Sequence, residues 1–141
     1  MKSIILIAGL PGSGKARLAD EISQTEANCT VLADRNAIAS HGQETSANET
    51  LVVHSPDFCS DTVRDETTKL LQEKFGSQCP IRWIFFENKS CICMENVGHR
   101  RKHTDNRQIA KEILALSKHY HIPEDAPVEK VIIEKVRHRP A

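Results

Sequence analysis

The chain has 141 residues and a mass of 15.8 kDa, which suits a single domain with one hydrophobic core. Lys and Arg together number 19, as do Asp and Glu, so the formal net charge is zero and no overall basic field attracts nucleic acid. Hydrophobic residues make up 39% and charged residues 27%, a balance typical of a globular protein that excludes a disordered chain. No apolar run approaches the 18 or so residues that a membrane-spanning helix needs, so we expect no membrane association.

In the first half of the chain, short apolar runs alternate with helical patterns. Residues 3–8 form a continuous apolar run that predicts a buried strand, and a helix is predicted over 14–23. A short strand over 30–33 is expected to stop at Asp34. The polar stretch 35–49 is predicted to be a mobile loop.

The alternation continues through the second half. A third strand is predicted over 50–54, and Asp61 is expected to cap a helix that runs to Phe75 and ends at Gly76. A fourth strand is predicted over 81–86. Helices over 91–101 and from Asp105 or Asn106 onward, and a final strand over 129–135, complete the pattern. It predicts an α/β domain with a mostly parallel sheet and right-handed crossovers.

The number and spacing of the cysteines indicate the redox state of the compartment in which the protein is expected to lie. The five cysteines are odd in number, and no pair has the Cys-x2-Cys spacing of a zinc site. Disulfides persist mainly in oxidising compartments, so we expect reduced thiols and a cytoplasmic location.

One motif carries chemistry. The run Gly9-Leu10-Pro11-Gly12-Ser13-Gly14-Lys15-Ala16 nearly matches the phosphate-binding pattern G-x-x-x-x-G-K-[ST]. Its glycines let the backbone turn around an anion, so that successive N–H groups form a concave nest, and the following helix directs its N-terminus at the same phosphates. Lys15 is expected to reach the β- and γ-phosphates of ATP. The residues predicted to hold the nucleotide here are Gly9, Pro11, Gly12, Ser13, Gly14, Lys15 and Ala16.

Ala16 departs from the motif. The pattern has a hydroxyl at this position, which ligates Mg²⁺, and alanine has none. The nest and Lys15 remain, and Mg²⁺ can replace a protein ligand with water. We therefore expect the change to weaken turnover more than nucleotide binding.

At these residues the chain resembles a small P-loop kinase of the polynucleotide-kinase and nucleotide-kinase type. Ala33-Asp34-Arg35-Asn36 falls where such kinases place an acidic residue that activates the acceptor hydroxyl, and Leu51 to Asp57 resembles their third strand. Arg100, Arg101 and Arg107 lie where these kinases place a basic lid, here over 98–107. The resemblance implies ATP and Mg²⁺ as cofactors. It also implies a three-layer αβα domain over 1–141, with a five-stranded sheet in the order 2-3-1-4-5.

The candidate side chains outside the loop have alternative interpretations. Asp34 is our candidate for the general base and a candidate metal ligand, or else a residue of a turn or helix cap. Asp57 is a second candidate metal ligand, or else a turn residue after Pro56. The basic run with Arg100, Arg101 and Arg107 could stabilise a transferring phosphoryl group, contact a nucleic-acid backbone, or form a solvated helix end.

We therefore predict an ATP-binding small kinase that phosphorylates a hydroxyl acceptor, either a polynucleotide 5′ end, a nucleoside or a small metabolite. One alternative is a nucleotide-binding module with weak or no catalysis, which Ala16 favours. Another is an NTP hydrolase. Nucleic acid as a partner has no support from the net charge.

Overall fold

Alternating strands and helices build this protein in a computed structural model that describes residues 1–41, 47–100 and 106–134. The strands are β1 (Ser3–Ala8), β2 (Cys29–Leu32), β3 (Thr50–Ser55), β4 (Ile81–Phe86) and β5 (Val128–Glu129). The helices are α1 (Lys15–Thr25), α2 (Ala37–Ser40), the 3-10 helix η1 (Pro56–Cys59), α3 (Asp61–Phe75), α4 (Ser90–Arg100) and α5 (Asn106–His119).

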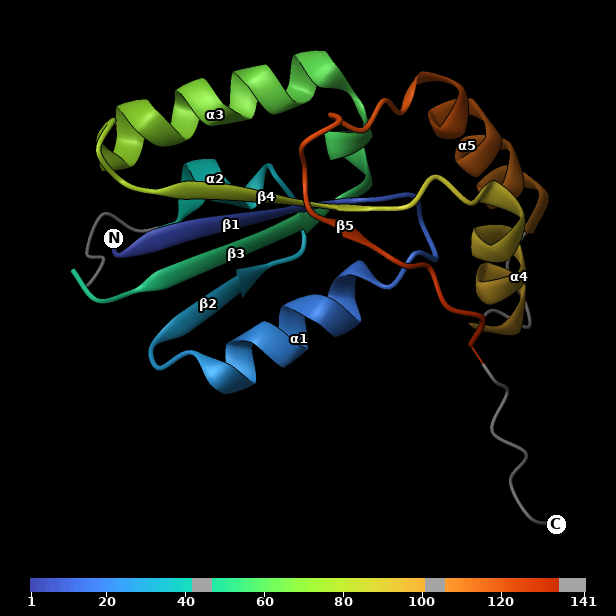
Figure 1. Ribbon diagram of the computed structural model, residues 1–141, viewed down its shortest axis with the longest axis horizontal. Helices are drawn as coiled ribbons and strands as arrows, with labels where there is room; N and C mark the ends of the chain where they lie inside the picture. The colour runs from blue at the N-terminus through green and yellow to red at the C-terminus, as the bar shows by residue number, and fades with distance from the viewer. Residues whose placement is uncertain (42–46, 101–105, 135–141) are drawn as a thin grey trace, which may run out of the picture.

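The five strands form one sheet in the order β2-β3-β1-β4-β5, and every neighbouring pair is parallel. This confirms the predicted fold class and strand order. The central strand β1 is buried from Ile4 to Ala8, because helices cover both faces of the sheet. Figure 1 shows α1 on one side of the sheet and α2 and α3 on the other.

The carboxyl ends of the central strands meet at one edge of the sheet. In the register of the sheet, Ala8 at the end of β1 pairs with Ser55 of β3 and with Phe85 of β4. Helices α4 and α5 lie side by side beyond this edge (Figure 1). Parallel α/β sheets bind their ligands at this edge.

Tyr120, just after α5, forms hydrogen bonds that hold the end of this helix at the carboxyl edge of the sheet. Its hydroxyl donates to the carbonyl of Phe86 at 2.6 Å and lies 3.4 Å from the carbonyl of Ala8. The ring is buried, which raises the pKa of the phenol. The neutral hydroxyl therefore stays a donor at physiological pH.

The predicted helix over 61–75 is confirmed, but its predicted cap was one residue too late. Ser60 is the N-cap, and its hydroxyl accepts a hydrogen bond from the N–H of Val63 at 3.4 Å. Asp61 is the first helical residue and pairs with Arg64. Gly76 ends the helix at φ 93°, as expected.

The final strand is shorter than predicted. β5 has two residues, and residues 131–134 continue past it without pairing as a strand. Side chains hold this segment instead: the carboxylate of Glu87 accepts from the N–H of Val131 at 3.2 Å, and Asn96 contacts Ile132 and Glu134. The prediction over 129–135 was therefore wrong in length, because apolar Val131 packs into the core without a neighbouring strand.

The predicted loop over 35–49 lies partly outside the described residues. It contains the short helix α2, and residues 42–46 of it are not described.

Among the helices that the structure describes, none has the length and apolar character to cross a bilayer.

Candidate phosphate-binding site

The loop between β1 and α1 turns sharply at the carboxyl edge of the sheet. The N–H of Ser13 donates to the carbonyl of Leu10 at 3.1 Å and closes a turn inside the loop. Gly12 and Gly14 have φ angles of 86° and 108°, in a region that side chains disfavour. The motif glycines therefore allow the backbone path that an anion-binding nest requires.

Gly12 also lies too close to α4 to carry a side chain. A Cβ atom at this residue would lie 2.4 Å from the carbonyl oxygen of Cys93 and 2.9 Å from a methyl carbon of Val97. Helix α4 thus packs directly on the loop backbone and fixes its position.

Lys15 begins α1 and folds back over the loop. Its ammonium donates to the carbonyl of Leu10 at 2.9 Å, and its side chain is buried. The first N–H groups of α1 have no partner within the helix, and the helix dipole places partial positive charge at the same end. Together these groups concentrate positive potential at the loop, which suits a phosphate group.

Asn96 of α4 joins the loop to the C-terminal segment. Its side-chain amide donates to the carbonyl of Gly12 at 3.0 Å and to that of Ile132 at 2.8 Å, and its oxygen accepts from the N–H of Glu134 at 2.8 Å. The side chain is almost fully buried. One residue thus aligns two segments far apart in the sequence.

We expect Asn96→Ala to lower the free energy of unfolding by about 2–4 kcal/mol, because it leaves buried backbone groups without their partners. The control is Asn88→Ala. Asn88 is exposed and also donates to carbonyls, those of Ser117 and Tyr120, so its loss should cost about 1 kcal/mol or less. Urea unfolding measures both values. An equal, small effect in both variants would contradict the role given to Asn96.

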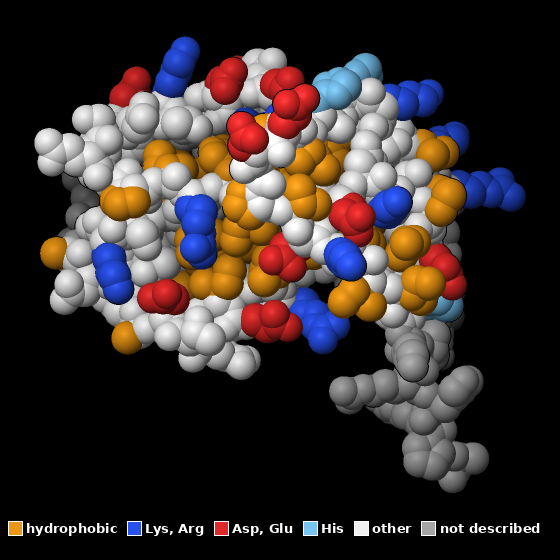
Figure 2. All heavy atoms as spheres, in the orientation of Figure 1, with side chains coloured by type: hydrophobic (Ala, Val, Ile, Leu, Met, Phe, Trp, Pro, Cys, Tyr) orange, Lys and Arg blue, Asp and Glu red, His pale blue; other side chains and the backbone are white. Residues whose placement is uncertain are grey.

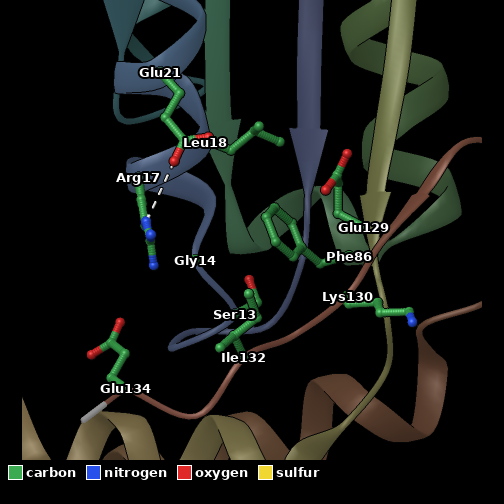
Figure 3. Close-up of a pocket in the computed structure, with 10 residues that line it drawn as sticks. All are labelled: Ser13, Gly14, Arg17, Leu18, Glu21, Phe86, Glu129, Lys130, Ile132 and Glu134. Carbon is green, nitrogen blue, oxygen red and sulfur yellow. Dashed lines mark ion pairs between the residues drawn. The ribbon is translucent and has the colours of Figure 1, made fainter.

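A cleft of about 130 Å³ lies on the α1 side of the loop, and we call it the α1 cleft. Figure 3 shows Arg17 and Glu21 on α1, joined by an ion pair, across from Ile132 and Glu134 of the C-terminal segment. The hydroxyl of Ser13 is buried and has no hydrogen-bond partner within the described part of the chain. The residues that line the α1 cleft are Ser13, Gly14, Arg17, Leu18, Glu21, Phe86, Glu129, Lys130, Ile132 and Glu134.

A second cavity of about 420 Å³, the loop cavity, lies on the other side of the loop. Gly14 lines both spaces, so the loop separates them. The ends of β2 and β3 form one wall of the loop cavity, and α4 and α5 form the opposite wall. Its lining residues are Pro11, Gly12, Gly14, Lys15, Ala16, Ala33, His54, Pro56, Val97, Ile109 and Glu112.

Two titratable groups near Lys15 are held neutral. Burial lowers the pKa of His54, the Lys15 ammonium lowers it further, and Asp20 opposes the shift. Burial raises the pKa of the Cys59 thiol to about 12, although Lys15 and Arg64 act against that change. At neutral pH, Lys15 is therefore the positive charge among these three groups.

The structure brings part of the predicted site together. The predicted residues from Pro11 to Ala16 line one or both of the two spaces, whereas Gly9, Asp34 and Asp57 line neither. The carboxylate of Asp34 accepts from the N–H of Asn36 at 3.1 Å, and that of Asp57 lies 3.4 Å from the guanidinium of Arg35. Ala33, one residue before Asp34, does line the loop cavity.

The predicted basic lid over 98–107 is described only in part. Arg100 is the last residue of α4, but its side chain lies outside the described part, as does all of Arg101. Arg107 is exposed near the start of α5, two residues before Ile109 of the loop cavity. The role of these three arginines stays a prediction.

Sequence reasoning missed three side chains of the site: His54, Asn96 and Glu112. His54 could have been found, because it lies one residue before the end of the strand that pairs with β1. Glu112 and Asn96 come from helices whose placement no local pattern indicates.

Comparisons with known proteins give one relative in sequence and likenesses in fold. No family model matches the chain. Over 116 residues the chain is 30% identical to "Uncharacterized protein R277" of Acanthamoeba polyphaga mimivirus, a match that covers 80% of this chain and 81% of that protein.

Two solved structures resemble the fold. A gluconokinase from Sinorhizobium meliloti 1021 superposes with a TM-score of 0.56 at 15% identity, over 92% of this chain and 82% of that one. The crystal structure of APE1195 superposes with a TM-score of 0.55 at 19% identity, over 92% and 84% of the two chains. The protein therefore has a P-loop kinase-like fold, and it belongs to the same family as the mimivirus protein.

Proposed function

We propose that this protein binds ATP on the loop from Gly9 to Ala16 and transfers its γ-phosphoryl group to a hydroxyl acceptor, as a small kinase of the polynucleotide-kinase or nucleotide-kinase type. The observation that carries the proposal is the loop itself. Gly12 and Gly14 adopt positive φ angles, and the Lys15 ammonium lies over the turn at the carboxyl end of the central strand. This combination of nest, cation and helix N-terminus is suited to a polyphosphate.

The two spaces beside the loop suit the two ends of a nucleotide. The α1 cleft has apolar walls from Phe86 and Ile132, which suit a nucleotide base. The loop cavity contains Lys15, so it suits the transferring phosphoryl group and the acceptor. Because Gly14 lines both, one molecule lying across the loop could reach both spaces.

In the proposed transfer, the acceptor oxygen forms a bond to the γ-phosphorus as the bond to the bridging oxygen of ADP breaks. Lys15 neutralises the charge that spreads over the phosphoryl oxygens. We propose that the Asp34 carboxylate accepts the hydroxyl proton and that Arg100, Arg101 and Arg107 close over the phosphates. Support for Asp34 is its position next to Ala33, which lines the loop cavity.

The charge on the face that Figure 2 shows, together with the zero net charge, favours a small acceptor over a polynucleotide. Figure 2 shows acidic and basic side chains interspersed over one face, without a continuous basic surface. The zero net charge agrees with that picture. A phosphate backbone is usually bound by clustered Lys and Arg.

We expect Asp34→Asn to slow phosphoryl transfer by about 100-fold or more while leaving ATP affinity within about twofold, because the amide keeps the shape but accepts no proton. Asp65→Asn on α3, also an exposed aspartate, is the control. Steady-state rates with each acceptor measure the effect. Equal turnover in Asp34→Asn and the parent protein would remove Asp34 from the mechanism.

Product analysis tests the proposed activity. ATP is incubated with a 5′-hydroxyl oligonucleotide, with nucleosides, or with gluconate, which is included because one structural neighbour is a gluconokinase. A kinase forms ADP in step with a phosphorylated acceptor. ADP formed without any acceptor would instead identify an NTP hydrolase.

A nucleotide-binding module without catalysis is the second candidate, and Ala16 favours it. Its methyl group lines the loop cavity at the position where the motif has a hydroxyl. Such a module would bind ATP with the same loop and form almost no ADP with any acceptor.

A further inference from the structure

The loop cavity lacks the oxygen ligands that a divalent cation prefers. In nucleotide sites Mg²⁺ keeps several waters and is held by one or two carboxylates together with the substrate phosphates. Ala16 offers none, and among the described residues that line the cavity Glu112 is the one carboxylate. Nor do the described residues contain any group of three His, Cys, Asp or Glu side chains that could hold a metal. The described lining of the loop cavity therefore offers Mg²⁺ one carboxylate, on α5, and no hydroxyl from the loop motif.

The two carboxylates predicted as metal ligands have other partners. The Asp34 carboxylate caps the N–H of Asn36, and Asp57 pairs with Arg35. Arg35 also lies 3.8 Å from the carboxylate of Glu66, and both line a separate cavity beside α3. Neither carboxylate lines the loop cavity in the protein alone.

His54 lies in the loop cavity instead. It is the last but one residue of β3, pairs in register with Ile7 of β1, is half-buried, and lines the same cavity as Lys15 and Ala16. The Lys15 ammonium is close enough to affect its protonation. A basic side chain thus lines the same cavity as the phosphate loop and as Ala16, where the motif has its metal-binding hydroxyl.

We propose that this phosphate loop binds the polyphosphate of a nucleotide without a divalent cation, and that His54 takes up a proton on binding and supplies the second positive charge beside Lys15. The proposal rests on the proposed nucleotide binding and extends it to the charge balance of the site. An anion within a few ångströms favours the charged form of an imidazole, so the incoming phosphate reverses the effect of Lys15. The proton comes from the solvent and binds to the ring nitrogen that is unprotonated in the neutral imidazole.

The sign of the pH dependence follows from these charges. The charged groups that act on His54 or share its cavity are Lys15 and Asp20 on α1 and Glu112 on α5. Burial and Lys15 hold the pKa of His54 below 6.5 in the protein alone, and bound phosphate raises it. Affinity therefore rises as the pH falls. The gain is complete below the pKa of the unbound protein and is lost as the pH rises through the pKa of the complex.

The test is calorimetric titration of ADP, and of inorganic triphosphate, into the protein at pH 6.0 and pH 7.5. Each titration is done with Mg²⁺ and with EDTA at equal ionic strength, in two buffers of different ionisation enthalpy. We expect ADP to bind in EDTA as tightly as in Mg²⁺, or more tightly, with net proton uptake. His54→Gln should remove the uptake and weaken binding at pH 6.0 by roughly tenfold. His119→Gln, at an exposed position on α5, should change neither.

Several results would contradict the inference. Tightening by Mg²⁺ of tenfold or more in the unmodified protein would mean that a metal completes the site, whatever the variants do. Unchanged proton uptake in His54→Gln would assign the proton to another group. If neither ADP nor triphosphate binds under any condition, the proposed function itself fails, and the inference fails with it.

Discussion

Lys15→Ala should weaken nucleotide binding by roughly 10- to 150-fold, corresponding to about 1.5–3 kcal/mol for a hydrogen bond to a charged group. The side chain begins α1 and lies over the loop, where its ammonium donates to Leu10. The truncation removes the one cation of the loop motif but leaves the backbone nest. Fluorescence titration with a labelled ADP measures the affinity.

Lys69→Ala is the matched control, because Lys69 is an exposed lysine on α3, away from the loop. Its affinity for ADP should equal that of the parent protein. Thermal unfolding of both variants separates lost binding from lost folding. Equal affinities of Lys15→Ala and Lys69→Ala would show that Lys15 does not contact the nucleotide.

Gly12→Ala should be the most destabilising of the substitutions considered. The new Cβ meets the carbonyl oxygen of Cys93 at 2.4 Å, and the residue has a φ of 86°. Backbone strain of this kind costs about 1–3 kcal/mol, and overpacking against a rigid helix adds roughly the same again. Either the loop or α4 must move, so we expect ADP binding to be lost as well.

Gly76→Ala separates the two costs. Gly76 also has a positive φ, 93°, but a Cβ there meets nothing within 4 Å. It should cost about 1–3 kcal/mol in urea unfolding and leave ADP affinity unchanged. If Gly12→Ala unfolds no more easily than Gly76→Ala and still binds ADP, α4 does not confine the loop as the structure indicates.

The phosphate loop could be predicted from sequence because its function depends on local backbone geometry. Gly12, Gly14 and Lys15 are specified by a short motif between an apolar strand and a helix. The strand order came from a family resemblance, because hydrophobic patterns locate strands but do not say which of them pair.

Errors arose where distant side chains decide the local structure. Val131 to Ile133 have high strand propensity, yet Asn96 and Glu87 bind the backbone there in place of a neighbouring strand. Asp61 looked like a cap because aspartate favours that position. Ser60, one residue earlier, has the extended backbone that a cap needs.

The wall of the loop cavity opposite the strands was the least predictable part. Val97, Ile109 and Glu112 lie on helices, and their approach to Lys15 depends on how α4 and α5 pack beyond the sheet. Asp34 was a reasonable candidate from its place after a strand. In the protein alone, however, its carboxylate oxygen Oδ1 accepts a hydrogen bond from the N–H of Asn36. This bond competes with the acceptance of a proton by the same oxygen.

The most direct test of the central claim is an amide NMR titration of the isotope-labelled protein with ADP, because it reports where the nucleotide binds. We expect the largest shifts on the amides of Gly12, Gly14 and Lys15, with smaller shifts at Ile132 beside the α1 cleft. The same titration of Lys15→Ala should give little change at equal ADP concentration. Shifts confined to another region, such as the cavity around Trp83 and Arg64, or no shifts at millimolar ADP, would contradict nucleotide binding at this loop.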